Sequence, residues 1–553
     1  MASTKLPVLI VGAGPSGLTM ALCLAKHGVP VRIIDSSHEY HRGSRGSGLM
    51  PRSLEMFKML GILKQVEEKR GVIDPPARFY KYPETSDVAL TDANPLMPPI
   101  DPTPDRPLSS MWFVPQFRLE AVFRKELEKY GVTVELDHEL LNFEKTSSIV
   151  RARIRVKSNG EESLEEINAS FLVGADGAKG LVRKLLEIDF LGKTIDADGM
   201  LVANATVNGL STEFAHVWKL PNGLFFSLRP IDHTTKVFAM AVLGPGALLQ
   251  DQDNPGAIRN LFEKHVGRPD VTLGEFHWYS FFKPNMRMVS KFSEGRVFVV
   301  GDAAHIHSPH GGQGLNTSVQ DSFNLAWKMA LVFHEHSPIE LLDAYNEERL
   351  PVVTEMLRKV VGLYNAFSED AHKALTSAAH PKELFQLDIN YRWSPILIEE
   401  RNPQSASMEE LKAHAYVGWG SSLCAGDRAP DAPELVIKGV RESTTLFEIF
   451  NLIMHTILVF GDFLPFQNLG AIINSQSHPG AMQIFSVSRD SNATAPPDVA
   501  TIYDKGGHIH SAYKVDSDSA VLIIVRPDGF IGCIATSEVG VEKYLSLIFS
   551  KRG

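Results

Sequence analysis

The hydrophobic pattern changes its period twice within the first forty residues. Residues 8–11 form a short apolar run that is typical of a buried strand. After a glycine-rich turn, apolar side chains recur on one helix face, at Leu18, Ala21, Leu22 and Ala25. Gly28 stands where a helix would end, and residues 31–34 form a second apolar run. The pattern predicts a strand, a helix and a second strand.

Two later apolar runs each lead to an acidic residue. Residues 171–174 precede Asp176, and residues 297–300 precede Asp302; a glycine-containing turn and a helical pattern follow each acid. In open α/β sheets, ligands bind at the carboxyl ends of the strands, where both acids would lie. Taken separately, each is explained equally well as a turn aspartate.

The middle of the chain has a different pattern. Residues 196–290 alternate in places between apolar and polar side chains, which predicts an antiparallel sheet. We therefore expect a multidomain fold of the α/β and α+β classes. The expected parts are 1–195 and 291–415 for a Rossmann-like domain with following helices, 196–290 for an antiparallel-sheet domain, and 416–553 for a C-terminal domain.

Composition places the chain among globular proteins. Hydrophobic residues make up 44% and charged residues 22% of the 553 positions. No apolar run approaches the roughly 20 residues of a membrane span. The nearest candidate, residues 446–460, is interrupted by Glu448, Asn451 and His455 and is better read as domain core. We expect no stable membrane insertion and, because the first residues do not resemble a signal peptide, a cytoplasmic location.

Charge and cysteine content exclude two further classes. The net charge of −10 is not offset by a basic stripe, which argues against nucleic-acid binding. The three cysteines, Cys23, Cys424 and Cys533, are far apart, so the sequence predicts neither a disulfide framework nor paired metal ligands.

The first turn carries a dinucleotide signature. Gly12, Gly14 and Gly17 have G-x-G-x-x-G spacing, and Asp35 ends the second apolar run. These glycines allow a tight turn in which backbone N–H groups and a helix N-terminus meet a pyrophosphate, while the acid binds ribose hydroxyls. A carboxylate there would repel a 2′-phosphate, so this site favours FAD or NAD over NADP. The alternative is a glycine-rich turn without a ligand.

These motifs together resemble a family. In order, G-x-G-x-x-G, "GADG" and "GDAAH…P…GGQGLN…QD..NLAWK" are similar to the FAD-dependent aromatic hydroxylases, the single-component flavoprotein monooxygenases of the p-hydroxybenzoate hydroxylase and phenol hydroxylase type. The segments at 42–62, 114–123 and 341–352 are also similar to segments of that family. The resemblance covers nearly the whole chain and implies FAD and NAD(P)H as cofactors.

The resemblance implies roles for individual residues. Gly12, Gly14, Gly17 and Asp35 would hold the ADP half of FAD, although glutamate is commoner than aspartate at position 35. Further along the cofactor, Arg45 and Gln116 would reach the diphosphate and ribityl region. Asp176 would serve both FAD and NADPH, and Asp302 would bond the ribityl or pyrophosphate part.

The glycine-rich loop before the helix at 313 would lie against the isoalloxazine ring. Pro309 would lie near its reactive C4a edge, and the N–H groups of Gly314, Leu315 and Asn316 near its pyrimidine end. A helix N-terminus suits this place because it offers partial positive charge and unpaired donors to the negative charge of reduced flavin. No second G-x-G-x-x-G domain for NADPH is apparent in the sequence, which agrees with the family.

The sheet domain would cover the substrate cavity. Its candidates are Phe226, Trp278 and Arg287 for substrate contact and Tyr279 for a proton-handling role. Aromatic side chains in alternation are, however, more often core than pocket. We also considered a metal site at His305, His307 and His310 and set it aside, because these histidines lie within the flavin loop. The six tryptophans form no "WxWxIP" segment of the flavin halogenases.

The segment from residue 426 to the end resembles the thioredoxin-like C-terminal domain of the phenol hydroxylase branch. It lacks C-x-x-C, so we expect packing or homodimer formation rather than redox exchange. The implied reaction is hydroxylation of a phenolic or other aromatic substrate by molecular oxygen through a flavin C4a-hydroperoxide. Decarboxylating hydroxylation, epoxidation and Baeyer–Villiger insertion remain alternatives, as does a flavin-binding scaffold without turnover.

Overall fold

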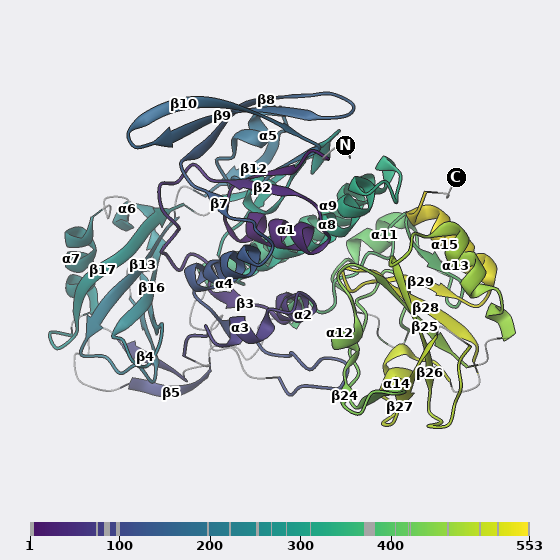
Figure 1. Ribbon diagram of the computed structural model, residues 1–553. Helices are drawn as coiled ribbons and strands as arrows, with labels where there is room; N and C mark the ends of the chain where they lie inside the picture. The colour runs from purple at the N-terminus through teal and green to yellow at the C-terminus, as the bar shows by residue number, and fades with distance from the viewer. Residues whose placement is uncertain are drawn as a thin grey trace.

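The computed structural model describes residues 5–550. The gaps within this range are 73–75, 82–88, 96–99, 196–197, 221–222, 250–253, 267, 284, 310, 370–381, 404, 419, 421, 462–463, 497–498 and 517–518. Figure 1 shows a central body of helices, with a large sheet on one side and a C-terminal domain on the other. No helix among these residues is long and apolar enough to cross a membrane.

The central body is built on a six-stranded sheet in the order β19-β20-β11-β1-β2-β7. Five of its strands, β20, β11, β1, β2 and β7, run parallel, and β19 is antiparallel to β20. The predicted strand–helix–strand unit is thereby confirmed. The elements are β1 (Val8–Val11), α1 (Pro15–Lys26), β2 (Val31–Ile34), α4 (Gln116–Glu128), β7 (Val134–Glu135), β11 (Phe171–Gly174), α5 (Leu181–Leu185), β19 (Ser293–Glu294), β20 (Val297–Val299) and α8 (Gln313–Phe333).

Small ribbons and helices surround this sheet. A three-stranded ribbon lies above it in Figure 1, and α1 packs against both α4 and α8 below. The ribbon is β8 (His138–Lys145), β9 (Val150–Ser158) and β10 (Glu161–Ala169); the other elements are β3 (Gly48–Leu49) paired with β6 (Trp112–Phe113), β12 (Phe190–Thr194) with β18 (Asn285–Val289) and β21 (His305–Ile306), α2 (Pro51–Met59), α3 (Leu63–Glu67) and the 3-10 turn η1 (Gly301–Ala303).

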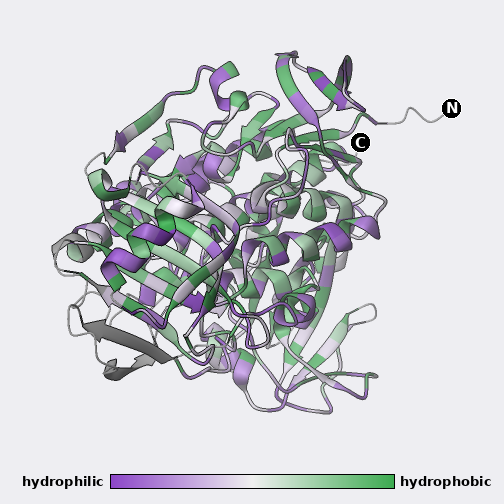
Figure 2. Cartoon of the chain, turned by 90° about the vertical axis from the view of Figure 1, so that its left-hand side faces the viewer, coloured by the Kyte–Doolittle hydropathy of each residue, from purple (hydrophilic) through white to green (hydrophobic). Residues whose placement is uncertain are grey.

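The predicted antiparallel sheet is present and has seven strands, β17-β13-β16-β15-β14-β4-β5. It extends beyond the expected range 196–290, because β4 and β5 come from before residue 100 and β4 pairs parallel with β14. Figure 2, seen from this side, shows hydrophobic and hydrophilic residues interspersed along the strands. The elements are β4 (Pro76–Lys81), β5 (Ala89–Pro95), β13 (Asp198–Asn208), β14 (Ala215–Lys219), β15 (Phe225–Pro230), β16 (Val237–Pro245), α6 (Gly246–Leu249), α7 (Pro255–Val266) and β17 (Thr272–Phe282).

The C-terminal domain contains an eight-stranded sheet in the order β22-β29-β28-β25-β26-β27-β23-β24. The apolar segment 446–460 lies inside it, where every residue of β25 is buried. The elements are β22 (Ile398–Glu399), β23 (Leu435–Ile437), β24 (Ser443–Thr444), α12 (Leu446–Ile449), β25 (His455–Phe460), η4 (Leu464–Phe466), α13 (Leu469–Gln476), β26 (Met482–Ser488), β27 (Ala500–Asp504), α14 (His508–Tyr513), β28 (Val521–Val525), β29 (Ile531–Ala535) and α15 (Glu538–Ile548).

Buried charges fasten this domain to the central body. The Glu348 carboxylate accepts from Arg526 Nη1 at 2.6 Å and from Lys328 Nζ at 2.8 Å, and all three side chains are fully buried. Arg428 pairs with Glu55 of α2 in the same way, at 3.0 Å. Glu348 lies on the long helix of this region, whose elements are η2 (Ile339–Leu342), α9 (Asp343–Glu369), η3 (Lys382–Phe385) and α11 (Met408–Ala413).

Candidate functional site

The first glycine turn is shaped by two close approaches and one open position. A Cβ added at Gly12, whose φ is +105°, would lie 2.3 Å from the Ala175 carbonyl oxygen. One added at Gly17 would lie 1.9 Å from the Gly12 oxygen, whereas nothing lies within 4 Å of one at Gly14. Gly12 and Gly17 are therefore needed for packing, and Gly14 leaves the N-terminus of α1 open to a phosphate.

Asp35 lies directly beside this turn. Its carboxylate accepts from the N–H groups of Ala13 at 2.8 Å and of Ser37 at 2.9 Å, so it is fixed at the end of β2. It remains only half-buried. This is the place where an acid binds the ribose of a dinucleotide whose pyrophosphate lies on the glycine turn.

Asp302 follows β20 at the carboxyl end of the parallel sheet. Its side chain is exposed to solvent. Surrounding protein raises its pKa, against the lowering effect of His305 and Arg45. Arg45 is also exposed and lies close enough to act on this carboxylate, so a polar ligand at this end of the sheet would meet both side chains.

Asp176 caps a helix at the edge of this region. Its Oδ2 accepts from Val182 N at 2.9 Å, which supplies the first turn of α5 with an acceptor. Its buried Oδ1 has no hydrogen-bond partner. Burial raises the pKa of Asp176, although three backbone N–H groups and Arg183 oppose the rise. One carboxylate oxygen therefore has a structural role in capping α5, and the other has no hydrogen-bond partner within the protein.

The loop from Gly301 to the start of α8 contains glycines in the left-handed backbone conformation. Gly301, Gly311 and Gly312 have φ values of 58°, 86° and 64°. Half-buried Pro309 accepts from Gly312 N at 3.1 Å, and α8 starts at Gln313. The N–H groups of Gly314 and Leu315 thus belong to the first turn, whose donors have no partner within the helix.

Asn316 holds the loop rather than facing outward. Its buried side chain accepts from Met50 N and Ser53 Oγ, both at 2.7 Å, and donates to the Gly48 and Gly312 carbonyl oxygens, both at 2.8 Å. All four side-chain hydrogen bonds are therefore internal. Only the backbone of Asn316 is left for the role expected at the pyrimidine end of a flavin.

Gln116 connects helix α4 to the segment that carries Arg45. Its Oε1 accepts from Gly46 N at 3.1 Å, and its Nε2 donates to Glu120 Oε1 at 2.8 Å. Burial raises the pKa of Glu120 to about 7. A Cβ on Gly46 would touch Leu315 at 3.4 Å, so this segment runs beside the start of α8.

The seven-stranded sheet presents alternate residues to this site. Trp278 packs on Gly43, where an added Cβ would lie 2.2 Å from the indole ring, and the Arg45 guanidinium lies 5.8 Å from the ring centroid. In the register of β13 and β17, Trp278 is opposite Asn204, while Tyr279 is opposite Ala203. Trp278 therefore faces the central body and Tyr279 faces away from it.

Two expected site residues lie on that far face: Phe226, expected to contact substrate, and Tyr279, expected to handle a proton. Phe226 is fully buried beside Phe262 of α7, at a ring-centroid distance of 5.8 Å, and Tyr279 packs against the same cluster. The structure does not bring Phe226 or Tyr279 to the candidate site. The reason is that aromatic residues occur on both faces of this sheet, so alternation alone does not show which of them face the site.

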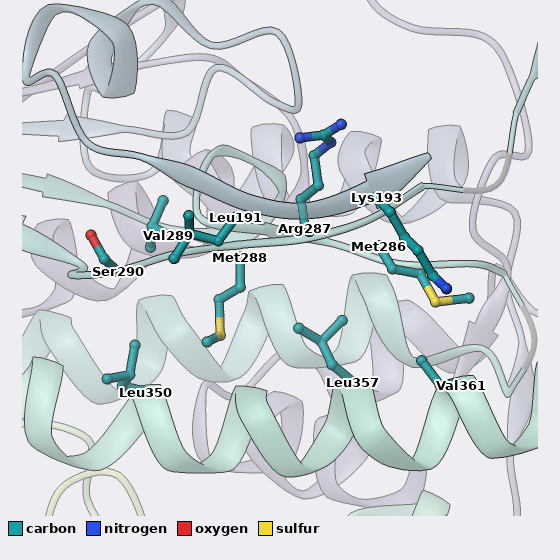
Figure 3. Close-up of a pocket in the computed structure, with 11 residues that line it drawn as sticks. Leu191, Lys193, Met286, Arg287, Met288, Val289, Ser290, Leu350, Leu357 and Val361 are labelled. Carbon is teal, nitrogen blue, oxygen red and sulfur yellow. The ribbon is translucent and has the colours of Figure 1, made fainter. Parts of the chain in front are cut away.

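Arg287 is held by its own ribbon. It donates to Asn285 Oδ1 at 3.0 Å and to the Phe190 carbonyl oxygen at 3.1 Å. Arg287 is one of the residues that line a pocket of about 400 Å³ between β18 and α9, together with Met286, Met288 and Leu357. Figure 3 shows its guanidinium pointing away from α9. The structure gives Arg287 a role in tying β12 to β18 and does not place it beside Trp278.

Comparisons with known proteins identify the class. A family model described as "FAD binding domain" matches residues 5–360, and one described as "Phenol hydroxylase, C-terminal dimerisation domain" matches residues 483–552. The flavin-dependent monooxygenase of Mycobacteroides abscessus is 34% identical over 556 residues, covering 98% of this chain and 99% of the relative. The chain belongs to the FAD-dependent aromatic monooxygenases.

Other relatives and structures agree with this class. The pentachlorophenol 4-monooxygenase of Sphingobium chlorophenolicum is 30% identical over 361 residues, which is 64% of either chain. The crystal structure of the flavin-dependent monooxygenase PieE, in complex with FAD and substrate, has the same fold: the TM-score is 0.78, with 22% identity over 99% of both chains.

The cradle of this monooxygenase fits FAD. Gly14 has open space where a side chain would lie, Asp35 is anchored beside it, and Asp302 and Arg45 are both exposed and close enough to interact. When bound, FAD would supply the oxygen-activating chemistry. The residues named above would hold it.

Sequence reasoning missed the buried support behind the flavin loop. Asp321 of α8 accepts from Gly301 N at 3.0 Å and contacts His305 Nε2 at 2.7 Å. Its other oxygen accepts from Arg349 Nε at 2.8 Å. Asp321 is the acid of the segment "QD..NLAWK", which was the available signal, but its partner Arg349 lies on a different helix.

The described histidines that were considered as metal ligands, His305 and His307, are not arranged as a metal site. His305 is engaged by Asp321, His307 lies within 2.6 Å of the Ser308 carbonyl oxygen, and His310 lies outside the described residues. Within the described ranges, no group of three or more His, Cys, Asp or Glu side chains is arranged to hold a metal ion.

Proposed function

We propose that this protein uses NAD(P)H and molecular oxygen to hydroxylate a phenolic or other electron-rich aromatic substrate. In balance, the arene, oxygen, NAD(P)H and a proton give the hydroxyarene, NAD(P)⁺ and water. The observation that carries the proposal is that the segment 43–46 touches both the start of α8, at Leu315, and Trp278 of the seven-stranded sheet, so that it brings the two surfaces near each other. An aromatic guest between them would lie beside the flavin.

The chain's own residues would hold the cofactor in three places. The turn at Gly12, Gly14 and Gly17 would bind the pyrophosphate, and Asp35 the ribose. Further along the cofactor, Arg45 and Gln116 would serve the diphosphate and ribityl part. The two remaining acids, Asp176 and Asp302, are proposed to contact FAD, and Asp176 also NADPH.

The start of α8 would stabilise charge. Its first-turn donors, at Gly314 and Leu315, would face the negative charge of the reduced ring, and the backbone of Asn316 would lie close by. Pro309 would lie near the reactive edge of the flavin. The rigid loop and the sheet would keep water from the reacting atoms, which is the protein's main contribution in flavin chemistry.

We further propose that the C-terminal domain forms a homodimer. Its last 70 residues match a domain described as a dimerisation domain. All three cysteines are buried, and none forms a disulfide. Packing and assembly are thus the proposed roles of this domain.

The first experiment is an absorbance spectrum of the purified protein, followed by NADPH and NADH oxidation with a panel of phenols and hydroxybenzoates. A flavin spectrum, consumption that rises with one phenol, and a product heavier by one oxygen would support the proposal. Release of carbon dioxide would point to decarboxylating hydroxylation. A flavin-bearing protein whose nicotinamide oxidation responds to no aromatic compound would contradict it.

A further inference from the structure

Asn204 stands out among the residues that face the candidate site. It lies on β13, its side chain is only 3% exposed, and its Oδ1 has no hydrogen-bond partner. Leaving a buried amide oxygen unpaired is unfavourable by roughly 1–3 kcal/mol. Most buried polar groups in proteins have a hydrogen-bond partner, so an unpaired one calls for an explanation, of which a bound molecule is one.

The position of Asn204 on the sheet shows where that partner would come from. Asn204 is directly opposite Trp278 of β17 and Ala239 of β16, so all three share the face toward the central body. A register shift follows immediately, between Asn204 and Ala205. Such β-bulges often re-aim a side chain next to a functional site.

The same face is incompletely covered. Along β15 and β16, the residues on the α7 face, Phe226, Leu228, Phe238, Met240 and Val242, are buried. Those on the Asn204 face, Ser227, Arg229, Ala239 and Ala241, are half-buried. Three of these four side chains, those of Ser227, Ala239 and Ala241, are small, so the sheet surface around Asn204 is not filled by large apolar groups as the α7 face is.

We propose that Asn204 determines substrate specificity by hydrogen-bonding a hydroxyl or carbonyl substituent of the aromatic substrate. This inference rests on the proposed function. The carboxamide both donates and accepts, so it would bind either substituent. A site that buries an amide for this purpose discriminates against an analogue without the polar group, because the amide is then left unpaired.

The test compares pairs of aromatics that differ in one polar group. Suitable pairs are resorcinol and 3-methylphenol, hydroquinone and 4-methylphenol, 4-hydroxyacetophenone and 4-isopropylphenol, and 1-hydroxyanthraquinone and 1-methylanthraquinone. For each pair, kcat/KM and the spectral shift of bound FAD are measured with wild type, Asn204→Ala and Asn204→Leu. Asn208→Ala is the matched control, because Asn208 is an exposed asparagine on the same strand.

Wild type and Asn208→Ala should prefer the polar member of at least one pair by about 10- to 100-fold, and both Asn204 variants should lose that preference. Asn204→Leu, free of substrate, should melt at the wild-type temperature or above, because an unpaired buried polar atom is removed. A preference that survives in Asn204→Ala, or none in wild type, would overturn the inference. If no aromatic compound supports turnover or shifts the spectrum, the proposed function itself fails. In that case the melting temperature still tests the inference. If Asn204→Leu melts below wild type, the Asn204 amide is paired within the protein, and the inference is wrong independently of the proposed function.

Discussion

The buried carboxylate of Asp321 offers a sharp test of how the flavin loop is held. Asp321 and Arg349 are fully buried, and the carboxylate joins three elements: Gly301 of η1, His305 of β21 and Arg349 of α9. We predict that Asp321→Asn weakens FAD binding and destabilises the protein. The amide would keep the shape of the side chain and remove its charge.

The magnitude follows from what would be left behind. Removing one partner of a buried ion pair typically destabilises a protein by about 3–5 kcal/mol, because the other charge stays uncompensated. Arg349 would still donate to Tyr391 Oη at 2.9 Å and to the Thr317 carbonyl oxygen at 3.4 Å, so the lower figure is expected. If about half of this 3 kcal/mol destabilises the FAD-binding conformation of the loop, the Kd of FAD rises about tenfold.

The sign of the pH dependence is also fixed. Burial raises the pKa of Asp321, but Arg349 and His305 outweigh it and hold that pKa below the ordinary value of 3.8. A carboxyl whose pKa is lowered by folding adds stability that is complete above its unfolded pKa and is lost as the pH falls below about 4. Wild type should lose this contribution in acid, and Asp321→Asn should lack it at pH 7.

The assay is flavin release on heating, together with FAD titration of the apoprotein. Glu347→Gln is the control, since Glu347 is an exposed acid two residues from Arg349 on the same helix. The double variant Asp321→Asn with Arg349→Met measures the coupling. If Asp321→Asn binds FAD as tightly as wild type and releases it at the same temperature, the carboxylate does not support the loop.

Three further perturbations have definite outcomes. Gly17→Ala should abolish FAD binding and destabilise the apoprotein, because the added Cβ would lie 1.9 Å from the Gly12 carbonyl oxygen. Gly14→Ala should weaken FAD binding without changing the melting temperature of the apoprotein, because nothing lies within 4 Å of its Cβ. FAD content and the apoprotein melting temperature distinguish the two outcomes. Folding raises the pKa of Glu120 from 4.5 to about 7, so the ionised side chain destabilises the folded protein increasingly as the pH rises above 4.5. Glu120→Gln should therefore stabilise the protein by on the order of 2–3 kcal/mol at pH 8 and by under about 1 kcal/mol at pH 5. Equal denaturation midpoints for wild type and variant at pH 8 would contradict this. Trp278→Ala should lower kcat/KM by about tenfold or more, whereas Tyr279→Phe should stay within about twofold; equal losses would place both residues on one face.

The parts of the fold that were predictable from sequence are those with local signals. The strand, turn and helix at residues 8–26 are specified by apolar period and glycine spacing, and the structure has them in the predicted order. The boundaries of the sheet domain were not predictable in this way. Strand β4 joins the sheet by pairing with β14, far along the chain, and no local pattern records such a partner.

The cofactor side of the site was more accessible to sequence reasoning than the substrate side, for a physical reason. Phosphate and ribose are bound by backbone turns and strand-end acids, which need particular residues at fixed spacing, as at Gly12, Gly17 and Asp35. Asp302 follows the same rule. Supporting residues such as Asp321 are fixed by tertiary contact with Arg349, 28 positions away, so their role became visible only in three dimensions.

On the substrate side, neighbouring residues on one strand differ completely in what they meet. Trp278 and Tyr279 are adjacent aromatics, yet one touches Gly43 of the central body and the other packs with Phe276 on the α7 side. Because α7 packs on one face and Trp278 meets the central body from the other, aromatic residues occur on both faces. The sequence period of two shows which residues share a face without showing which face is functional. The near face keeps a buried amide, at Asn204, without a hydrogen-bond partner for its oxygen. Leaving such a group unpaired is unfavourable, and for this reason we expect a polar substituent of the substrate to supply the missing hydrogen bond.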